Sequence, residues 1–238
     1  MLRDRLRPVH APGGPGLTTG DRPGCDPASR CAANEFGERD ARSDLRSLRK
    51  DGPSRTTRWL IDALRVGGVD GWSVIDIGAG VGAVHLELLD AGAAAAIDVD
   101  ISPAYVAAAR DEAARRGHAD RVTHTVGDFV ALASGLDPAD VVALDRVVCC
   151  YADMAALVSL SADRARRRYG LVYPRDSWWI RTGARVANAV THLFRSRVTF
   201  HAHRTADVDR LVRASGLQPR FHRRTVFWQV AVYERPTA

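Results

Sequence analysis

Five short apolar runs alternate with segments of helical length between residues 73 and 173, and this alternation constrains the fold more than any other feature. The runs are SVIDI, AAAIDV, RVTHTV, VVALD and YGLVY, at residues 73–77, 94–99, 121–126, 141–145 and 169–173. The helical segments are expected at 81–91, 103–116 and about 153–167. Because such alternation is typical of a parallel sheet covered on both faces, we predict an α/β, Rossmann-like, doubly wound fold.

The C-terminal part of the chain has a different pattern. Residues 217–234 contain two strand-like runs, LQPRFHRRTV and FWQVAVYE, with almost nothing between them. Two neighbouring runs without an intervening helix predict an antiparallel hairpin. Together with the five earlier runs, they predict a mostly parallel seven-stranded sheet that ends in a C-terminal antiparallel hairpin.

The N-terminal part is set apart by its composition. Residues 1–30 are rich in proline and glycine and have no hydrophobic periodicity, so we predict a disordered or loosely attached arm. Residues 31–68 are predicted to form an N-terminal helical extension, in which Ser54 caps a helix. The main domain is expected at 69–238, with an insertion at about 174–203.

The chain is basic overall, with 34 lysines and arginines, 28 acidic residues and a net charge of +6. Lys50 is the only lysine, and the arginines are scattered among acids, so the bias indicates coding composition rather than a nucleic-acid surface. The sequence has no apolar run of about 18 residues, and its first ten residues lack the apolar core of a secretory signal. Four cysteines without a dense framework fit a reducing compartment, so we expect a cytoplasmic protein.

The first apolar run leads into a glycine-rich turn. Gly78, Gly80 and Gly82 occur where a strand is expected to turn into a helix. Glycine suits this place because the backbone must turn tightly and let a ligand approach, while the start of the helix attracts an anion. The glycines alone also fit a dinucleotide-binding fingerprint, Gly78-x-Gly80-x-x-Ala83.

Two acids favour a different ligand. Asp76 stands two residues before Gly78, where a carboxylate can meet an ammonium group but is awkward beside a pyrophosphate. Asp100 follows the second run at the spacing expected for an acid that binds ribose hydroxyls. Asp98 is expected to point the same way as Asp100, but Asp100 is the preferred ribose-binding acid because it lies at the end of the strand. We expect Asp98 to be a partly buried acid with a local hydrogen-bond partner.

With these residues the sequence resembles the class I S-adenosylmethionine-dependent methyltransferases, over about residues 45–235. The resemblance implies that the D-x-G-x-G-x-G element (76–82) holds the methionine part of S-adenosyl-L-methionine and that Asp100 binds both ribose hydroxyls. It also implies that the Gly-Asp-Phe element (127–129) holds the adenine, through its acid and its aromatic ring. The implied cofactor-binding residues are Asp76, Gly78, Ala79, Gly80, Gly82, Asp100, Ile101, Asp128, Phe129 and Asp145.

The segment DRVVCCYADM (145–154) follows the fourth run and is predicted to flank the transferable methyl group, because ligands bind beyond the carboxyl ends of the strands. It resembles the D-x-x-x-x-x-Y segment of the magnesium-protoporphyrin O-methyltransferase branch, with Cys150 where a histidine is expected there. A base is needed only if the acceptor must lose a proton. The candidate catalytic residues are Asp145, Tyr151, His201 and His203.

The insertion at about 174–203 leaves the fifth run at the ligand-binding edge, so we expect a lid over the cofactor. Its helix carries apolar residues on one side and arginines elsewhere. Three interpretations stay open: the helix packs on the body, lines an apolar substrate pocket, or makes a weak contact with a membrane surface. His201 and His203 alternate on an extended stretch, so both are predicted to face one side.

The chain has four cysteines, Cys25, Cys31, Cys149 and Cys150. Their spacing gives no C-x-x-C pair, and adjacent cysteines cannot easily point the same way, so no metal site is predicted. Cys149 and Cys150 are expected to line the acceptor pocket as small apolar residues. If the N-terminal arm folds over the cofactor, four thiols could instead meet around a metal or a trivalent metalloid.

These features predict a methyltransferase that uses S-adenosyl-L-methionine and acts on oxygen or nitrogen of a small, partly apolar molecule. The alternatives are an NAD(P)-dependent Rossmann oxidoreductase, a thiol-dependent metalloid methyltransferase and a non-catalytic cofactor-binding protein. A nucleic-acid substrate is not expected, because DRVVCCY stands where base methyltransferases normally carry N-P-P-Y or D-P-P-Y. The acceptor and the oligomeric state stay open.

Overall fold

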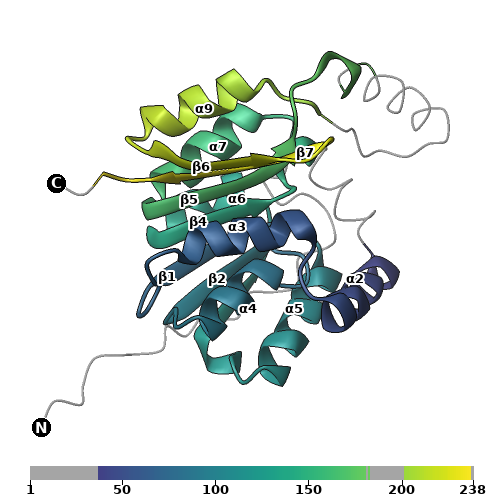
Figure 1. Cartoon of the computed structure of the whole chain (residues 1–238). Coiled ribbons are helices and arrows are strands. Elements are labelled where there is room, and N and C mark those ends of the chain that lie inside the picture. The colour runs from purple at the N-terminus through teal and green to yellow at the C-terminus, as the bar shows by residue number, and fades with distance from the viewer. Residues whose placement is uncertain (1–36, 181, 183–200, 237–238) are drawn as a thin grey trace, which may run out of the picture.

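The computed structural model describes residues 37–180, 182 and 201–236 (Figure 1). Its strands are β1 (Ser73–Ile77), β2 (Ala95–Asp100), β3 (Val122–Val126), β4 (Ala139–Asp145), β5 (Ala165–Pro174), β6 (Gln218–Arg224) and β7 (Trp228–Glu234). Its helices are α2 (Glu38–Asp51), α3 (Arg55–Arg65), α4 (Ala83–Asp90), α5 (Pro103–Arg115), α6 (Phe129–Leu132), α7 (Met154–Asp163) and α9 (Thr205–Ala214). Short 3-10 turns are η1 (Ala119–Arg121), η2 (Ala133–Gly135) and η3 (Val148–Cys150).

The strands form one sheet in the order β3-β2-β1-β4-β5-β7-β6. The pairs β1–β2, β2–β3, β1–β4 and β4–β5 are parallel, whereas β7 is antiparallel to both β5 and β6. The predicted mostly parallel seven-stranded sheet with a C-terminal antiparallel hairpin is therefore confirmed. The strand order reverses between β1 and β4, and ligands bind at the carboxyl ends of the strands at such a switch point.

Helices cover both faces of the sheet. The first face is covered by α3, α4 and α5, and the second by α6, α7 and α9 (Figure 1). Within β1, Val74 packs in the first core and Ile75 and Ile77 pack in the second, as alternating side chains of a strand must. Because both faces are buried, the central strands are nearly continuous apolar runs, which explains why they could be located in the sequence.

One predicted boundary was wrong. The helix expected to reach about residue 167 ends at Asp163, and β5 already begins at Ala165, so the ARRR segment belongs to a strand. Arg168 shows why: its Nη1 donates to the carbonyl oxygen of Leu64 at 2.5 Å from a buried position. Pairing of β5 with β4 and β7 therefore outweighs the helical propensity of the arginines.

The N-terminal extension consists of α2 and α3, joined at Gly52. As predicted, Ser54 caps α3 by accepting a hydrogen bond from the backbone N–H of Thr57. The helix α3 packs on β5 and β7, and α2 packs on α5. The predicted arm at 1–30 and most of the insertion at 174–203 lie outside the described residues.

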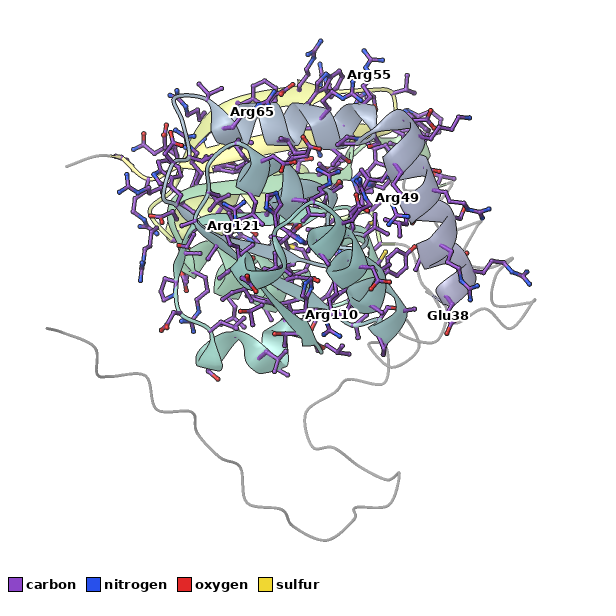
Figure 2. The ribbon with its side chains drawn as sticks, turned by 90° about the horizontal axis from the view of Figure 1, so that it is seen from below. Glu38, Arg49, Arg55, Arg65, Arg110 and Arg121 are labelled. Atoms are coloured by element: carbon purple, nitrogen blue, oxygen red, sulfur yellow. The ribbon has the colours of Figure 1, made fainter. Side chains whose placement is uncertain are left out.

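Arginines are spread over several elements of the face seen in Figure 2. Those labelled are Arg49, Arg55, Arg65, Arg110 and Arg121. Several of the charges are paired, as in the contact of Arg49 with the buried Glu112 at 2.8 Å. Throughout the described part of the chain, no helix combines the length and the apolar character that crossing a membrane requires.

Candidate active site

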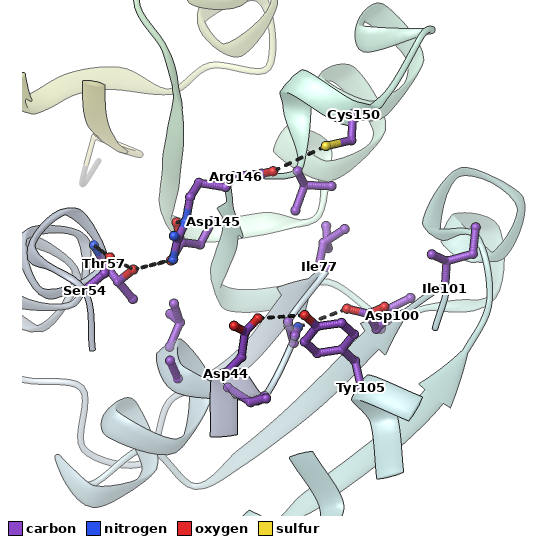
Figure 3. Close-up of a pocket in the computed structure, with 18 of the residues that line it drawn as sticks. Asp44, Ser54, Thr57, Ile77, Asp100, Ile101, Tyr105, Asp145, Arg146 and Cys150 are labelled. Atoms are coloured by element: carbon purple, nitrogen blue, oxygen red, sulfur yellow. Dashed lines mark hydrogen bonds and ion pairs between the residues drawn. The ribbon is translucent and has the colours of Figure 1, made fainter. Parts of the chain in front are cut away.

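A cavity of about 640 Å³ opens at the carboxyl ends of β1, β2 and β4 (Figure 3). Its volume falls within the range of small-molecule sites. Its walls come from the loop before α4, the ends of β2 and β4, the start of α6 and the elbow between α2 and α3. The predicted cofactor-binding residues that line it are Gly78, Ala79, Gly80, Asp100, Ile101, Asp128, Phe129 and Asp145.

The glycine-rich loop has a backbone that other residues adopt with difficulty. Gly78, Gly80 and Gly82 have φ angles of 61°, 58° and 85°, all in the left-handed region. A Cβ atom on Gly78 would lie 2.4 Å from Cγ2 of Val147, so a side chain has no room at this position. The loop therefore needs glycine for its conformation and for its close packing against the end of β4.

Asp100 connects the end of β2 to this loop. Its Oδ2 accepts a hydrogen bond from the backbone N–H of Gly80 at 2.9 Å, and its Oδ1 accepts one from that of Ser102 at 2.8 Å. Burial raises the pKa of Asp100 to about 6, although these two hydrogen bonds lower it. The carboxylate lines the cavity, where it is available to a ligand; its ribose-binding role stays a prediction.

Asp128 and Phe129 lie at the start of α6, farther along the cavity wall. The Asp128 carboxylate caps this helix by accepting from the backbone N–H of Val130 at 2.9 Å. The Tyr151 hydroxyl donates to both oxygens of the same carboxylate, at 2.8 and 3.0 Å. The predicted catalytic Tyr151 thus lines the cavity with its hydroxyl engaged by the predicted adenine-binding acid.

Asp145 and Arg146 form a charged pair on the wall at the end of β4 (Figure 3). Arg146 Nε lies 3.1 Å from Asp145 Oδ1, and Thr57 Oγ1 donates to Asp145 Oδ2 at 2.5 Å. Arg146 has a φ of 65°, and among the described residues it is the one non-glycine in the left-handed region. Such backbone strain is often found at functional sites. An acid beside a guanidinium can bind both charges of an α-amino acid.

Asp76 does not occupy the predicted position beside a ligand. It is 1% exposed and lies below the loop, outside the cavity wall. Its Oδ2 accepts from the backbone N–H of His85 and lies 2.9 Å from His85 Nδ1. The side chain faces α4 because the alternation of β1 places it on that side of the sheet. Gly82 likewise packs on His85 instead of lining the cavity.

His201 and His203 lie against the segment that follows β4. Their rings stack with centroids 5.6 Å apart, so they do face one side as predicted. The backbone N–H of His201 donates to the carbonyl oxygen of Cys149 at 2.7 Å, and the ring Nε2 of His203 donates to that of Tyr151 at 3.1 Å. Burial lowers the pKa of both histidines, and neither lines the cavity, so their position does not support a catalytic base.

Of the two adjacent cysteines predicted to line the acceptor pocket, one lies on the cavity wall. Cys150 lines the cavity, whereas Cys149 is buried behind it. The expectation that the two thiols point apart was wrong, because the turn η3 brings the sulfur atoms to 3.7 Å. Their mutual hydrogen bond raises the pKa of Cys149 and lowers that of Cys150. Cys25 and Cys31 lie outside the described residues, within which no three candidate ligands are grouped to hold a metal.

One wall of the cavity was missed by the sequence reasoning. The helix α2 and its elbow contribute Asp44, Ser54 and Thr57, and the Asp44 carboxylate accepts from the Tyr105 hydroxyl at 2.6 Å. The sequence carries the cap signal at Ser54, but no local pattern shows that the extension turns back over the end of the sheet. Only packing of α2 on α5 places these residues at the cavity.

Residues 74–166 match a family model described as a methyltransferase domain. A segment of 53 residues is 45% identical to ribosomal protein L11 methyltransferase from Erwinia tasmaniensis, covering 22% of this chain and 18% of the relative. The corresponding protein of Salmonella arizonae is 46% identical over 54 residues. The chain thus spans less than a fifth of the length of these curated relatives.

Solved structures resemble the chain over a larger part of its length. Magnesium protoporphyrin IX methyltransferase from Synechocystis PCC 6803, with bound S-adenosylhomocysteine, superposes with a TM-score of 0.68 at 21% identity, covering 87% of this chain and all of that one. An O-methyltransferase family protein from Burkholderia thailandensis gives a TM-score of 0.62 at 18% identity, covering 87% of this chain and 61% of that one. At this level of identity the likeness concerns the fold. Residues 74–166 are therefore similar to a methyltransferase domain, and the chain shares its fold with these methyltransferase structures.

Proposed function

We propose that the protein is an S-adenosylmethionine-dependent methyltransferase that acts on oxygen or nitrogen of a small, partly apolar molecule. One observation carries the proposal. A single cavity is lined by the glycine-rich loop, Asp100, the Asp128–Phe129 pair and Asp145, which supply groups suited to an amino acid, a ribose and an adenine. The cosubstrate is also the ligand, as such or as its product, in two of the magnesium protoporphyrin IX methyltransferase structures.

The chemistry requires positioning more than acid–base catalysis. The methyl group leaves a sulfonium centre, which is already a good leaving group, so alignment of the acceptor supplies much of the rate. If the acceptor must lose a proton, the candidate bases on the cavity wall are Asp145 and Tyr151. Both are engaged: Asp145 accepts from Thr57 and pairs with Arg146, and the Tyr151 hydroxyl donates to Asp128. A carboxylate acceptor would need no base.

The lining beyond the cosubstrate elements supports an acceptor of mixed polarity. Val147, Cys150 and Leu157 offer apolar surface, and Ser54 and Thr57 offer hydroxyl groups. The insertion that would complete this side, together with its proposed contact with a membrane surface, lies mostly outside the described residues. We therefore assign the acceptor by class, as a small molecule.

Calorimetry with the purified chain tests the proposal. S-adenosylhomocysteine should bind, and NAD⁺ and NADP⁺ should not. Release of S-adenosylhomocysteine from S-adenosylmethionine in the presence of a panel of phenols, carboxylic acids and amines would then identify the acceptor class. Binding of a nicotinamide dinucleotide without binding of S-adenosylhomocysteine would refute the proposal in favour of an oxidoreductase. Binding without turnover of any acceptor would favour a non-catalytic protein.

We expect Asp145 and Arg146 to hold the amino-acid end of the cosubstrate, because Asp76 is buried away from the cavity. Arg146→Gln should weaken the binding of S-adenosylhomocysteine by roughly 10- to 100-fold, which is the contribution of one hydrogen bond to a charged group. Binding of 5′-methylthioadenosine, which lacks the amino acid, should not change. Calorimetry with both ligands measures the difference.

Arg65→Gln is the matched control for this prediction, because Arg65 lies on α3 in an exposed pair with Asp62. It should change neither affinity. An equal loss for both ligands in Arg146→Gln would contradict the assignment, since it would place the guanidinium at the nucleoside or show a general disturbance of the cavity.

A further inference from the structure

A row of polar side chains lies beneath the floor of the cavity, on the face of the sheet that α4 covers. Asp76 of β1, Asp98 of β2 and His124 of β3 are direct neighbours in the parallel register, so they point to the same face. His124 Nδ1 lies 2.7 Å from Asp98 Oδ2. On α4, His85 pairs with Asp76 as described above, and the two imidazole rings lie edge to face, 6.4 Å apart. Two Asp–His pairs thus lie side by side.

This row differs from an ordinary core. The residues two positions earlier on the same three strands are Val74, Ala96 and Val122. In the polar row, by contrast, one atom of each side chain is buried without a hydrogen-bond partner among the described residues: Asp76 Oδ1, Asp98 Oδ1, His85 Nε2 and His124 Nε2. Buried polar atoms without partners cost free energy. Their concentration below a ligand site therefore calls for a functional reason.

The row continues directly into the cavity. Asp100 follows Asp98 by two residues on β2, so both carboxylates lie on the same face, and Asp100 is the one that lines the cavity. The pKa of Asp100 is raised first by burial and then by the nearby charges of Asp98 and Asp76. Burial and the charge of Asp98 also raise the pKa of Asp76, so the carboxyl groups of the row oppose one another's ionisation.

The other titratable groups around Asp100 are few. From α5, Tyr105 approaches it with a hydroxyl that is bonded to Asp44 of α2 (Figure 3). From α4, His85 packs against Gly82 of the loop: a Cβ on that glycine would lie 2.8 Å from the imidazole Cε1. His85 of the row thus touches the loop, and Asp98 lies two residues from Asp100 on the same strand.

We propose that Asp76 and Asp98 tune the ionisation of Asp100 and so set the pH below which the cosubstrate is released. The inference rests on the proposed function. His85 and His124 keep the two acids in place by giving each carboxylate a partner. Ribose hydroxyls bind an ionised carboxylate more strongly than a neutral carboxyl group. As the pH falls through about 6, Asp100 takes up a proton and the affinity falls; above that range the full affinity is present.

Asp98→Asn tests the proposal, because asparagine keeps the shape and an acceptor oxygen for His124 but removes the charge. The affinity of the full chain for S-adenosylhomocysteine is measured by calorimetry between pH 5 and 8. We expect an unchanged affinity at pH 8 and a midpoint of the affinity loss that is lower by roughly 0.5–1.5 pH units. Asp76→Asn should shift the midpoint in the same direction, and Asp100→Asn should remove the pH dependence.

Asp62→Asn on the exposed side of α3 is the charge control and should leave the midpoint in place. An unchanged midpoint in both Asp98→Asn and Asp76→Asn would overturn the proposal. So would an equal loss of affinity at every pH with a lower melting temperature, because that result marks a purely structural role. If the unaltered protein binds S-adenosylhomocysteine at no pH, the proposed function itself fails, and the two failures are thereby distinguished.

Discussion

Asp100→Ala is expected to weaken the binding of S-adenosylhomocysteine by about 100-fold or more at pH 8. The carboxylate reaches the cavity at the end of β2, where two ribose hydroxyls can donate to it. A hydrogen bond to a charged group contributes about 1.5–3 kcal/mol, and two of them together account for this loss. The substitution also removes the acceptor of the Gly80 N–H, so the loop loses one of its supports. Calorimetry at pH 8 measures the effect.

Two variants make this result interpretable. Asp62→Ala removes an exposed acid from α3 and should leave the affinity unchanged. Asp100→Asn keeps an acceptor oxygen and should lose less than Asp100→Ala. Unchanged affinity in Asp100→Ala would show that Asp100 does not bind the ribose. The ribose-binding acid would then be another carboxylate of the cavity wall.

Gly78→Ala is expected to lower the same affinity by about 100-fold. The left-handed φ of 61° costs an alanine about 1–2 kcal/mol. The new Cβ would also lie 2.4 Å from Cγ2 of Val147, a stiff β-branched side chain, so the loop must move by roughly 1 Å. A displacement of that size at groups that position a ligand costs about 100-fold.

Gly71→Ala is the matched control for the glycine prediction. Gly71 has a similar φ of 72°, but a Cβ there would meet nothing within 4 Å, and the residue does not line the cavity. This variant should lose stability in a thermal melt and keep its affinity. Adding Val147→Ala to Gly78→Ala should restore part of the affinity, because it removes the collision but not the backbone strain. Equal effects of Gly71→Ala and Gly78→Ala on affinity would contradict the argument.

The glycine-rich loop shows how much of the structure the local sequence predicts. Glycines at 78, 80 and 82 predicted a tight turn at a strand end, and all three adopt left-handed angles. The same motif did not show where its acid would point. Asp76 was expected beside the ligand, but the alternation of β1 directs it below the loop to His85. A side chain two residues before a turn faces one side or the other of the sheet, and only the packed sheet decides which.

The acceptor side shows the same limit more strongly. The exit of β4 was correctly expected at the site, and Asp145, Cys150 and Tyr151 do line the cavity. His201 and His203 do not line the cavity; each forms a hydrogen bond with a backbone carbonyl oxygen of the segment after β4. The hydrogen bond between Thr57 and Asp145 joins residues far apart in the chain, and no local sequence pattern predicts it.

By itself, the sequence determined the element order, the seven-stranded sheet and the edge of that sheet at which the cavity opens. These features follow from the spacing of apolar residues, from the lengths of the segments and from the positions of glycines, all of which are local signals within a few residues. Tertiary structure alone decided which acids reach the cavity and which are buried in the Asp–His row, and that α2 forms a wall. Those outcomes depend on register and on long-range packing, through which Asp98 and Asp100, two residues apart on one strand, receive different partners.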